Sequence, residues 1–297
     1  MKRLIPYLVV TSLAFTSAIF AQTPQEEPSD IKLKALYNNI SSAKFTHPES
    51  QRHHHLRYSQ GVVYGIYKHA LDSDRKLNFG VGYMNTQFHF SHHPKQSSFK
   101  QQHFDNALFR IGASTSEIHR WKWKADLELQ MNTDHFSLSR YTLFGATLRG
   151  RYKYHEKRNL HVGILALTGM RYTRLLPIIG MDYTISDKWQ LDAIFPTKMA
   201  LIYSLTQHWK LDAAIRYFLS RQRLDEHEHF RRGLVAYRNW GAEFGLSYNY
   251  NDTLHFNLHM GESFAGRLRI SNRNNSHRHH LKLDPALYYG FTATLIF

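Results

Sequence analysis

The sequence has no cysteine in its 297 residues, so neither a disulfide framework nor a lipidated cysteine is available. It also has no second long apolar run after residue 21, whereas each span of a helical membrane protein needs about 20 consecutive apolar residues. The mean hydropathy is −0.48. These absences leave two classes: a soluble domain with a sizeable core, or a membrane sheet that carries apolar side chains at alternate positions.

The first 21 residues have the layout of a secretory signal peptide. Lys2 and Arg3 give a positive start, and residues 4–20 form an almost uncharged apolar stretch. We expect a signal peptide over residues 1–21 with cleavage after Ala21; a membrane-anchoring signal is the alternative. Residues 22–30 are acidic and contain proline, which predicts a flexible leader, and residues 31–297 are expected to form the folded domain.

Alternating hydrophobicity is the main structural pattern of the chain. Aromatic residues make up 14% of it, which favours strands over helices. Residues 287–297 carry large apolar side chains at every second position, and residues 121–131 alternate Trp, Leu and Met with Lys, Asp and Glu. A helix would spread these charges around its surface, so the pattern predicts membrane-spanning strands with one face toward lipid.

A weak internal repeat gives the length of the structural unit. The stretch 183–193 is echoed by 203–213, and each copy places Tyr and Trp on either side of a short turn. The repeat has the length of one hairpin of tilted membrane strands, and its aromatics predict an interfacial girdle. Counting strands in this way predicts an all-β fold, an antiparallel transmembrane β-barrel of about 14 strands, with about 12 as the alternative.

Turn positions predict the orientation of this barrel, because bacterial barrels have short periplasmic turns and longer outer loops. Short turns are expected near 70–75, 115–120, 155–159, 186–187, 206–207 and 251–252. Outward connections include the long stretches 219–240 and 264–283, together with an unusually short connection at 196–197.

Two stretches resemble known families. Phe297 ends the chain, Leu295 and Tyr289 share its strand face, and this pattern resembles the outer-membrane insertion signal that the barrel-assembly machinery reads. The stretch 177–183, followed by Trp189, is similar to a family of functionally uncharacterised Gram-negative outer-membrane barrels. The resemblance implies a porin-like barrel in the cell outer membrane and brings no activity or catalytic residue with it.

Charged residues fall on the predicted inward face of several strands. They are Lys122, Lys124, Asp126, Glu128, Arg149, Arg151, Lys153, Asp192, Lys210, Asp212, Arg216 and Glu243. Side chains fill an eight-stranded barrel but not a much wider one. These residues are therefore expected to line a narrow, net basic lumen that passes small anionic solutes. The alternative is that they pair across the interior as a structural plug.

The formal net charge of +15 raises the question of nucleic-acid binding. The basic residues are spread over strands and loops rather than gathered in one motif, so we expect no nucleic-acid partner. Arginines at 221–232 and 267–278 fall in two expected outer connections, where lipopolysaccharide phosphates would supply counter-charge. The expected partners are therefore outer-membrane lipid and lipopolysaccharide, and no cofactor is expected.

The chain has 21 histidines, several of them clustered in the expected outer loops. Neutral imidazoles close together bind zinc, copper or nickel. The candidate ligands are His53, His54, His55, His277, His279 and His280. No fixed ligand spacing is present, so solvated polar loops are the simpler interpretation. The alternative function is a non-conducting surface barrel whose loops bind metal or lipopolysaccharide.

An enzyme and a soluble fold are the remaining interpretations. His89 with Ser91, and His135 with Ser137, each place a base and a hydroxyl on one strand face, as a serine hydrolase needs. Neither pair has an evident third residue, so we expect no enzymatic activity. A soluble periplasmic β-barrel or sandwich would turn its apolar side chains inward and its charges outward.

Overall fold

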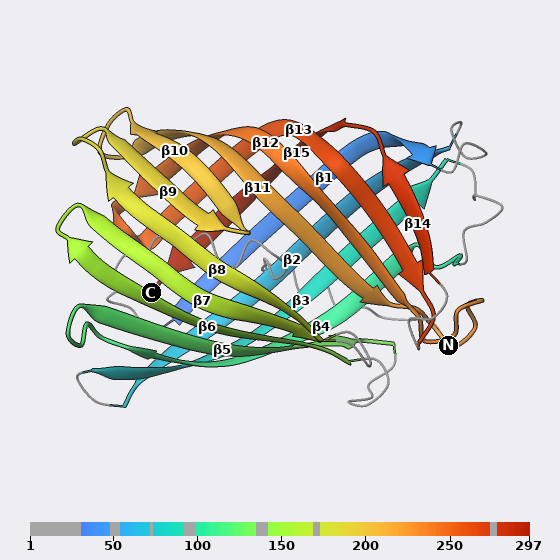
Figure 1. Ribbon diagram of the computed structural model, residues 1–297, viewed down its shortest axis with the longest axis horizontal. Helices are drawn as coiled ribbons and strands as arrows, with labels where there is room; N and C mark the ends of the chain where they lie inside the picture. The colour runs from blue at the N-terminus through green and yellow to red at the C-terminus, as the bar shows by residue number, and fades with distance from the viewer. Residues whose placement is uncertain are drawn as a thin grey trace, which may run out of the picture.

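A computed structural model describes residues 31–47, 54–71, 74–91, 99–134, 142–168, 173–273 and 278–297. Antiparallel strands make up most of this part of the chain and close into one barrel (Figure 1). The predicted signal peptide, 1–21, and leader, 22–30, lie outside the described residues. No described helix has the length and apolar content needed to cross a bilayer.

The barrel contains fifteen strand segments. They are β1 (Ile31–His47), β2 (His55–Ala70), β3 (Arg75–Phe90), β4 (His103–Thr115), β5 (Trp121–Asn132), β6 (Thr142–His155), β7 (Arg158–Thr168), β8 (Thr173–Thr184), β9 (Trp189–Phe195), β10 (Lys198–Ser204), β11 (Trp209–Arg223), β12 (Leu234–Tyr250), β13 (Leu254–Ser271), β14 (Arg278–Leu283) and β15 (Ala286–Ile296), with a short 3-10 helix, η3 (Asn251–Thr253), before β13. Because β14 and β15 share one place between β13 and β1, the barrel has 14 strand positions, which confirms the predicted count.

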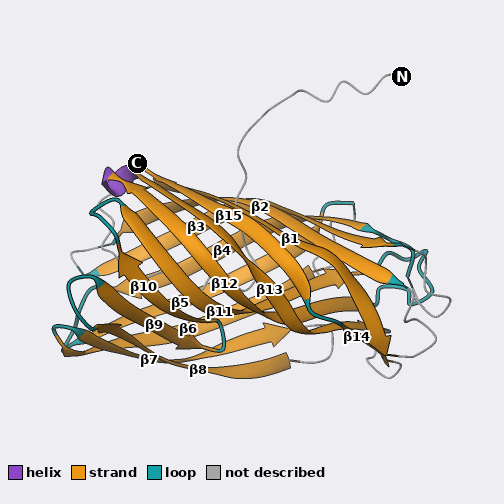
Figure 2. Cartoon of the chain, turned by 90° about the horizontal axis from the view of Figure 1, so that it is seen from above, coloured by secondary structure: helices purple, strands orange, loops and turns teal. Residues whose placement is uncertain are grey.

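The two ends of the barrel differ in their connections. At one end, here called the turn end, every expected short turn is present, and the C-terminal end of β15 lies beside η3 (Figure 2). At the opposite end, the loop end, the connections 224–233 and 272–277 are shorter than the expected 219–240 and 264–283. The expectation was wrong because β11, β12 and β13 continue as paired strands. Arg221 and Arg223 therefore lie on β11 and not in a loop.

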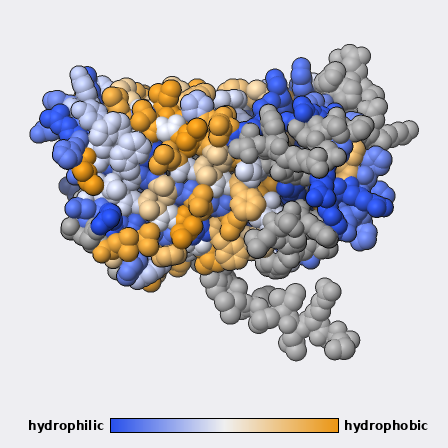
Figure 3. Space-filling view, turned by 60° about the horizontal axis from the view of Figure 1, so that its bottom comes forward, coloured by the Kyte–Doolittle hydropathy of each residue, from blue (hydrophilic) through white to orange (hydrophobic). Residues whose placement is uncertain are grey.

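Large apolar side chains cover the outside of the barrel. On β5, Leu127 is 58% exposed while the adjacent Asp126 is 8% exposed. On β12, Phe244 is 75% exposed beside Glu243, at 3%. Figure 3 shows apolar side chains gathered between two hydrophilic ends of the molecule. We call this region the apolar band, and it does not fit the soluble alternative, which places charges outside.

Aromatic rings gather at the turn end. Trp189 packs against Tyr203 with ring centroids 4.7 Å apart, and Trp209 packs against Tyr248 at 4.6 Å. The two pairs contain the tryptophans of the two repeat copies. Amphipathic rings at one level are typical of the interface between hydrocarbon and headgroups. This level therefore marks one boundary of the apolar band.

The hairpin of β9 and β10 is much shorter than the strands beside it. β8 pairs with β9 only over residues 179–184, and β11 pairs with β10 only up to Arg216. Within the described part of the chain, residues 173–178 and 217–223 have no partner strand on the edges that face this hairpin. The wall is therefore incomplete in the loop-end half, and Figure 1 shows β8 and β11 apart beyond the hairpin tip.

Candidate channel interior

The predicted lumen-lining residues lie at alternate positions of five strands. Lys122, Lys124, Asp126 and Glu128 are on β5; Arg149, Arg151 and Lys153 on β6; Asp192 on β9; Lys210, Asp212 and Arg216 on β11; and Glu243 on β12. The four residues Asp126, Asp192, Asp212 and Glu243 are buried, whereas Lys153, beside a turn, is exposed. A role of these residues in conduction stays a prediction.

Several acidic and basic side chains inside the turn-end half form ion pairs. Arg216 pairs with Glu243, which also accepts a hydrogen bond from the Tyr288 hydroxyl. Asp126 pairs with Arg110 of β4, with 2.9 Å from Nε to Oδ1 and 2.6 Å from Nη2 to Oδ2. A charge withdrawn from water needs such a partner, because the Coulomb attraction offsets the lost hydration.

Several inward charges were not among the predicted lumen residues. His161 Nε2 lies 2.7 Å from Asp182 Oδ2, and both side chains are buried. Lys198 Nζ lies 3.8 Å from Asp192 Oδ2. Arg110, His161, Asp182 and Lys198 lie on strands whose charges were not selected, whereas Asp192 was among the predicted lumen residues. Extending the alternation to β4, β7, β8 and β10 would have found them.

A group of amide and hydroxyl side chains crosses the interior. This polar belt consists of Gln60, Thr86, Asn106, Gln130, Ser220 and Gln222, all of them buried. Gln222 on β11 donates a hydrogen bond to Thr86 on β3 and accepts one from Asn106 on β4, both 2.9 Å long. On β5, Gln130 donates to the backbone carbonyl oxygen of Arg221 at 2.9 Å. The loop-end half of β11 therefore lies directly against β3, β4 and β5.

Apolar side chains fill the interior of the loop-end half. The largest fully buried ones in this apolar plug are Phe45, Phe88, Phe99, Phe104, Tyr237, Tyr288 and Leu56. The rings of Tyr58 on β2 and Tyr237 on β12 are 4.7 Å apart, so strands that are not neighbours in the sheet touch through the interior. Side chains therefore fill the interior of this half. The plug occupies the interior of the loop-end half.

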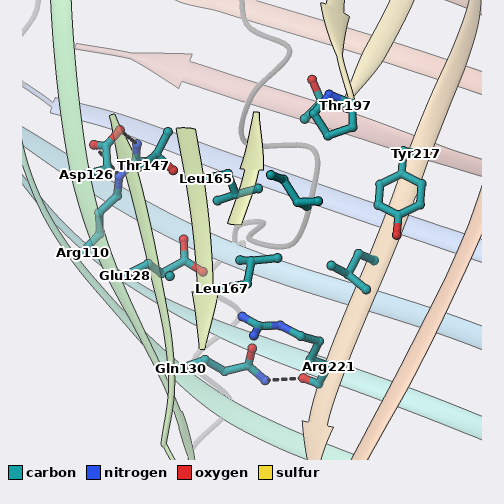
Figure 4. Close-up of a pocket in the computed structure, with 14 residues that line it drawn as sticks. Arg110, Asp126, Glu128, Gln130, Thr147, Leu165, Leu167, Thr197, Tyr217 and Arg221 are labelled. Carbon is teal, nitrogen blue, oxygen red and sulfur yellow. Dashed lines mark hydrogen bonds and ion pairs between the residues drawn. The ribbon is translucent and has the colours of Figure 1, made fainter. Parts of the chain in front are cut away.

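An open cleft remains between β11 and the inner faces of β4 to β8 (Figure 4). It contains about 730 Å³ of space free of protein atoms, part of it open to solvent. The residues that line this side cleft are Arg110, Asp126, Glu128, Gln130, Gly145, Thr147, Leu165, Leu167, Leu176, Pro196, Thr197, Tyr217, Leu219 and Arg221. The Arg221 guanidinium donates to the carbonyl oxygen of Thr168 on β7 at 2.7 Å. The side cleft combines charged and apolar groups in one space.

A family model described as a domain of unknown function, DUF6268, matches residues 18–293. The chain belongs to the DUF6268 family. This membership agrees with the predicted resemblance to uncharacterised outer-membrane barrels, which is confirmed. The described residues give this DUF6268 member a closed 14-strand barrel.

Relatives and a solved structure extend the comparison. An uncharacterised protein of Chlamydia pneumoniae is 23% identical over 203 residues, 68% of this chain and 64% of the relative. One of Chlamydia trachomatis is 20% identical over 188 residues, 63% of this chain and 59% of the relative. The matched region thus spans about three fifths of these relatives. An outer-membrane channel of Pseudomonas putida F1 has a TM-score of 0.54 at 8% identity, covering 93% of this chain and 100% of that one, which shows a shared fold alone.

The histidine clusters of this DUF6268 barrel form no recognisable metal site among the described residues. The structure describes His54, His55, His279 and His280, all near the loop end, whereas His53 and His277 lie outside the described residues. No group of three or more potential ligands comes together in the described part. Metal binding by these loops stays a prediction.

One of the two candidate hydrolase pairs lies among the described residues. His89 and Ser91 lie in a shallow pocket with Ser42, His55 and Arg57, and no carboxylate lines this pocket among the described residues. A serine hydrolase needs a third group that orients its histidine. His135 and Ser137 lie outside the described residues.

The predicted insertion-signal residues lie at the end of the chain. Tyr289 and Phe297 are exposed on the outer face, and Leu295 is half-buried. Tyr289 and Leu295 belong to β15, and Phe297 directly follows it. Their recognition by an assembly machinery stays a prediction.

Proposed function

We propose that this DUF6268 protein is an integral outer-membrane protein that acts as a narrow passive channel. The side cleft is the observation that carries the proposal. It places Arg110, Asp126 and Glu128 around open space inside a barrel with an apolar exterior. Withdrawing charges from water costs free energy, so a barrel that served only as an anchor would be more stable with an apolar interior. The fold shared with an outer-membrane channel supports the same function.

The proposed cargo is a small anionic solute. Basic residues outnumber acidic ones among the predicted lumen residues, and Lys32, Lys34 and Arg110 add to them at inward positions of β1 and β4. A basic lining attracts anions and repels cations near the constriction. Because the apolar plug occupies the interior of the loop-end half, we expect a small conductance.

The proposed orientation has the turn end in the periplasm and the loop end outside the cell. Short turns at one end and longer connections at the other support this orientation. Outer-membrane lipid, lipopolysaccharide and the barrel-assembly machinery are the proposed partners. Fractionation of cell envelopes, with electrophoresis before and after boiling, tests the membrane placement, and a protein recovered only in the soluble periplasm would contradict it.

Conductance across a planar bilayer tests the channel function. We expect small steps with a preference for anions in a potassium chloride gradient. The Lys124→Glu substitution reverses one half-buried charge of the interior and should reduce the anion preference. Lys157→Glu, in the exposed turn before β7, is the matched control and should leave it almost unchanged. A folded, inserted protein that never conducts would exclude the channel and favour an anchoring role.

A further inference from the structure

The side cleft lies beside the incomplete part of the barrel wall. The hairpin of β9 and β10 ends before it reaches residues 173–178 of β8 and 217–223 of β11. These two segments border the opening in the wall. The hairpin tip forms one limit of this opening, where Tyr217 N donates to Thr197 O at 2.9 Å. Leu176, Pro196 and Tyr217 belong both to the border and to the lining of the cleft.

The opening lies at the loop-end edge of the apolar band. Tyr217 pairs in register with Trp240 on β12, and their ring centroids are 5.1 Å apart. On the outer face of β8, beside the opening, Leu175 is 63% exposed. One step further toward the loop end, Arg238 pairs in register with Arg267. Two arginines side by side are typical of a surface that meets phosphate groups, so the opening faces the boundary between hydrocarbon and headgroups.

The cleft is amphipathic from one side to the other. Figure 4 shows Arg110, Asp126 and Glu128 at one side, Tyr217 and Thr197 at the opposite side, and Leu165 and Leu167 between them. Leu176 and Leu219 also line the cleft, and Leu165, Leu167 and Leu176 pack with Ile178 and Ile194. A ligand that fits this lining needs an apolar body and a polar head.

Positive charge concentrates where the head would lie. The guanidinium of Arg221 donates to backbone carbonyl oxygens of β6 and β7, and the charges of Glu128, Arg174 and Arg223 act on it. Arginine binds carboxylate and phosphate groups through paired N–H donors. Gln130 of the polar belt also lines this cleft, where it donates to the backbone carbonyl oxygen of Arg221.

We propose that the side cleft binds an anionic amphiphile, a molecule with one acidic headgroup and one apolar chain, which enters from the membrane between β8 and β11. The acidic head lies near Arg221, and the chain lies against the leucines. Passage of this ligand across the membrane rests on the proposed channel function, whereas its binding does not.

Binding is measured with the protein refolded into phosphatidylcholine nanodiscs and radiolabelled laurate as the probe, with empty nanodiscs as the blank. We expect saturable binding. Leu219→Trp fills the cleft and should weaken binding about tenfold, which is about 1.4 kcal/mol. Leu211→Trp, at an exposed position of the same strand outside the cleft, is the matched control and should bind like the native chain. Equal binding by all three proteins would overturn the proposal.

A comparison of laurate with dodecanol tests the acidic headgroup. Arg221→Gln should weaken laurate binding about tenfold and leave dodecanol binding nearly unchanged, because only laurate has a charge to lose. Mobility before and after boiling checks that the variant is folded. An equal loss for both ligands would overturn the assignment of the headgroup to Arg221.

The absence of cysteine allows a test of the route. A nitroxide attached to Leu219→Cys should collide with oxygen dissolved in lipid about as often as one attached to Leu211→Cys, on the exposed outer face. A label at 219 that meets only a water-soluble nickel complex would overturn entry from the membrane. Conductance separates the two proposals. Conductance without laurate binding would contradict only the amphiphile site, and laurate binding without conductance would contradict only the channel function.

Discussion

The two halves of the barrel interior are built from the same strands and contain opposite chemistry. On β4, Arg110 in the turn-end half forms a buried ion pair, while Phe104 on the same strand face belongs to the apolar plug. On β12, Glu243 and Tyr237 show the same contrast. A side chain at an inward position of a membrane barrel is therefore not always in contact with water.

The difference between the halves follows from the short hairpin. In the turn-end half, β9 and β10 complete the circumference, whereas in the loop-end half β8 and β11 lack these partners. Barrel diameter grows with the number of strands. The loop-end half is therefore narrower, β11 reaches the opposite wall, and the inward side chains pack into a dry core.

The largest effect on stability is expected when a charge is removed from the turn-end half. Asp126→Ala leaves the Arg110 guanidinium buried without its carboxylate and should reduce the free energy of unfolding by about 3–5 kcal/mol. Urea titration of the refolded protein in lipid measures the loss. Asp187→Ala, in the exposed turn before β9, is the control and should cost about 0.5 kcal/mol or less. A similarly small loss for Asp126→Ala would mean that this ion pair does not stabilise the turn-end half.

Removing an aromatic ring from the apolar plug tests the loop-end half in the same way. Phe88→Ala leaves a cavity among Tyr58, Phe99 and Phe104, and should cost about 3 kcal/mol of unfolding free energy. It should also enlarge the conductance step in a planar bilayer. Phe109→Ala, on the lipid-facing side of β4, should cost less and leave conductance unchanged. Unchanged conductance in the Phe88 variant would show that the plug does not limit ion flow.

A smaller effect is expected in the polar belt, between the two regions. Gln222→Leu removes the hydrogen bonds to Thr86 and Asn106 and should cost about 1–3 kcal/mol of unfolding free energy, because both partners stay buried. Gln207→Leu, in the exposed turn before β11, serves as the control in the same urea titration. A stabilised Gln222→Leu protein would show that the belt is not needed to hold β11 in the interior.

Periodicity predicted the strand faces well but could not predict which inward groups meet. Asp126 was selected from the alternation on β5, yet its partner depends on the register with β4. Glu128 is opposite Arg110 in that register, but the ion pair forms diagonally with Asp126. Gly112 is opposite Asp126, and a side-chain carbon there would overlap the carboxylate. The diagonal pair therefore depends on space that one glycine on the neighbouring strand provides.

Local sequence patterns were enough to predict the all-β class, the lipid-facing positions and the short turns, because strand alternation and turn chemistry act within a few neighbouring residues. They predicted the number of strand positions for the same reason. The tertiary structure adds that β11 crosses the interior, that apolar side chains fill the loop-end half and that a cleft lies beside the gap between β8 and β11. These features depend on which strands meet across the barrel, and a local pattern does not contain that information.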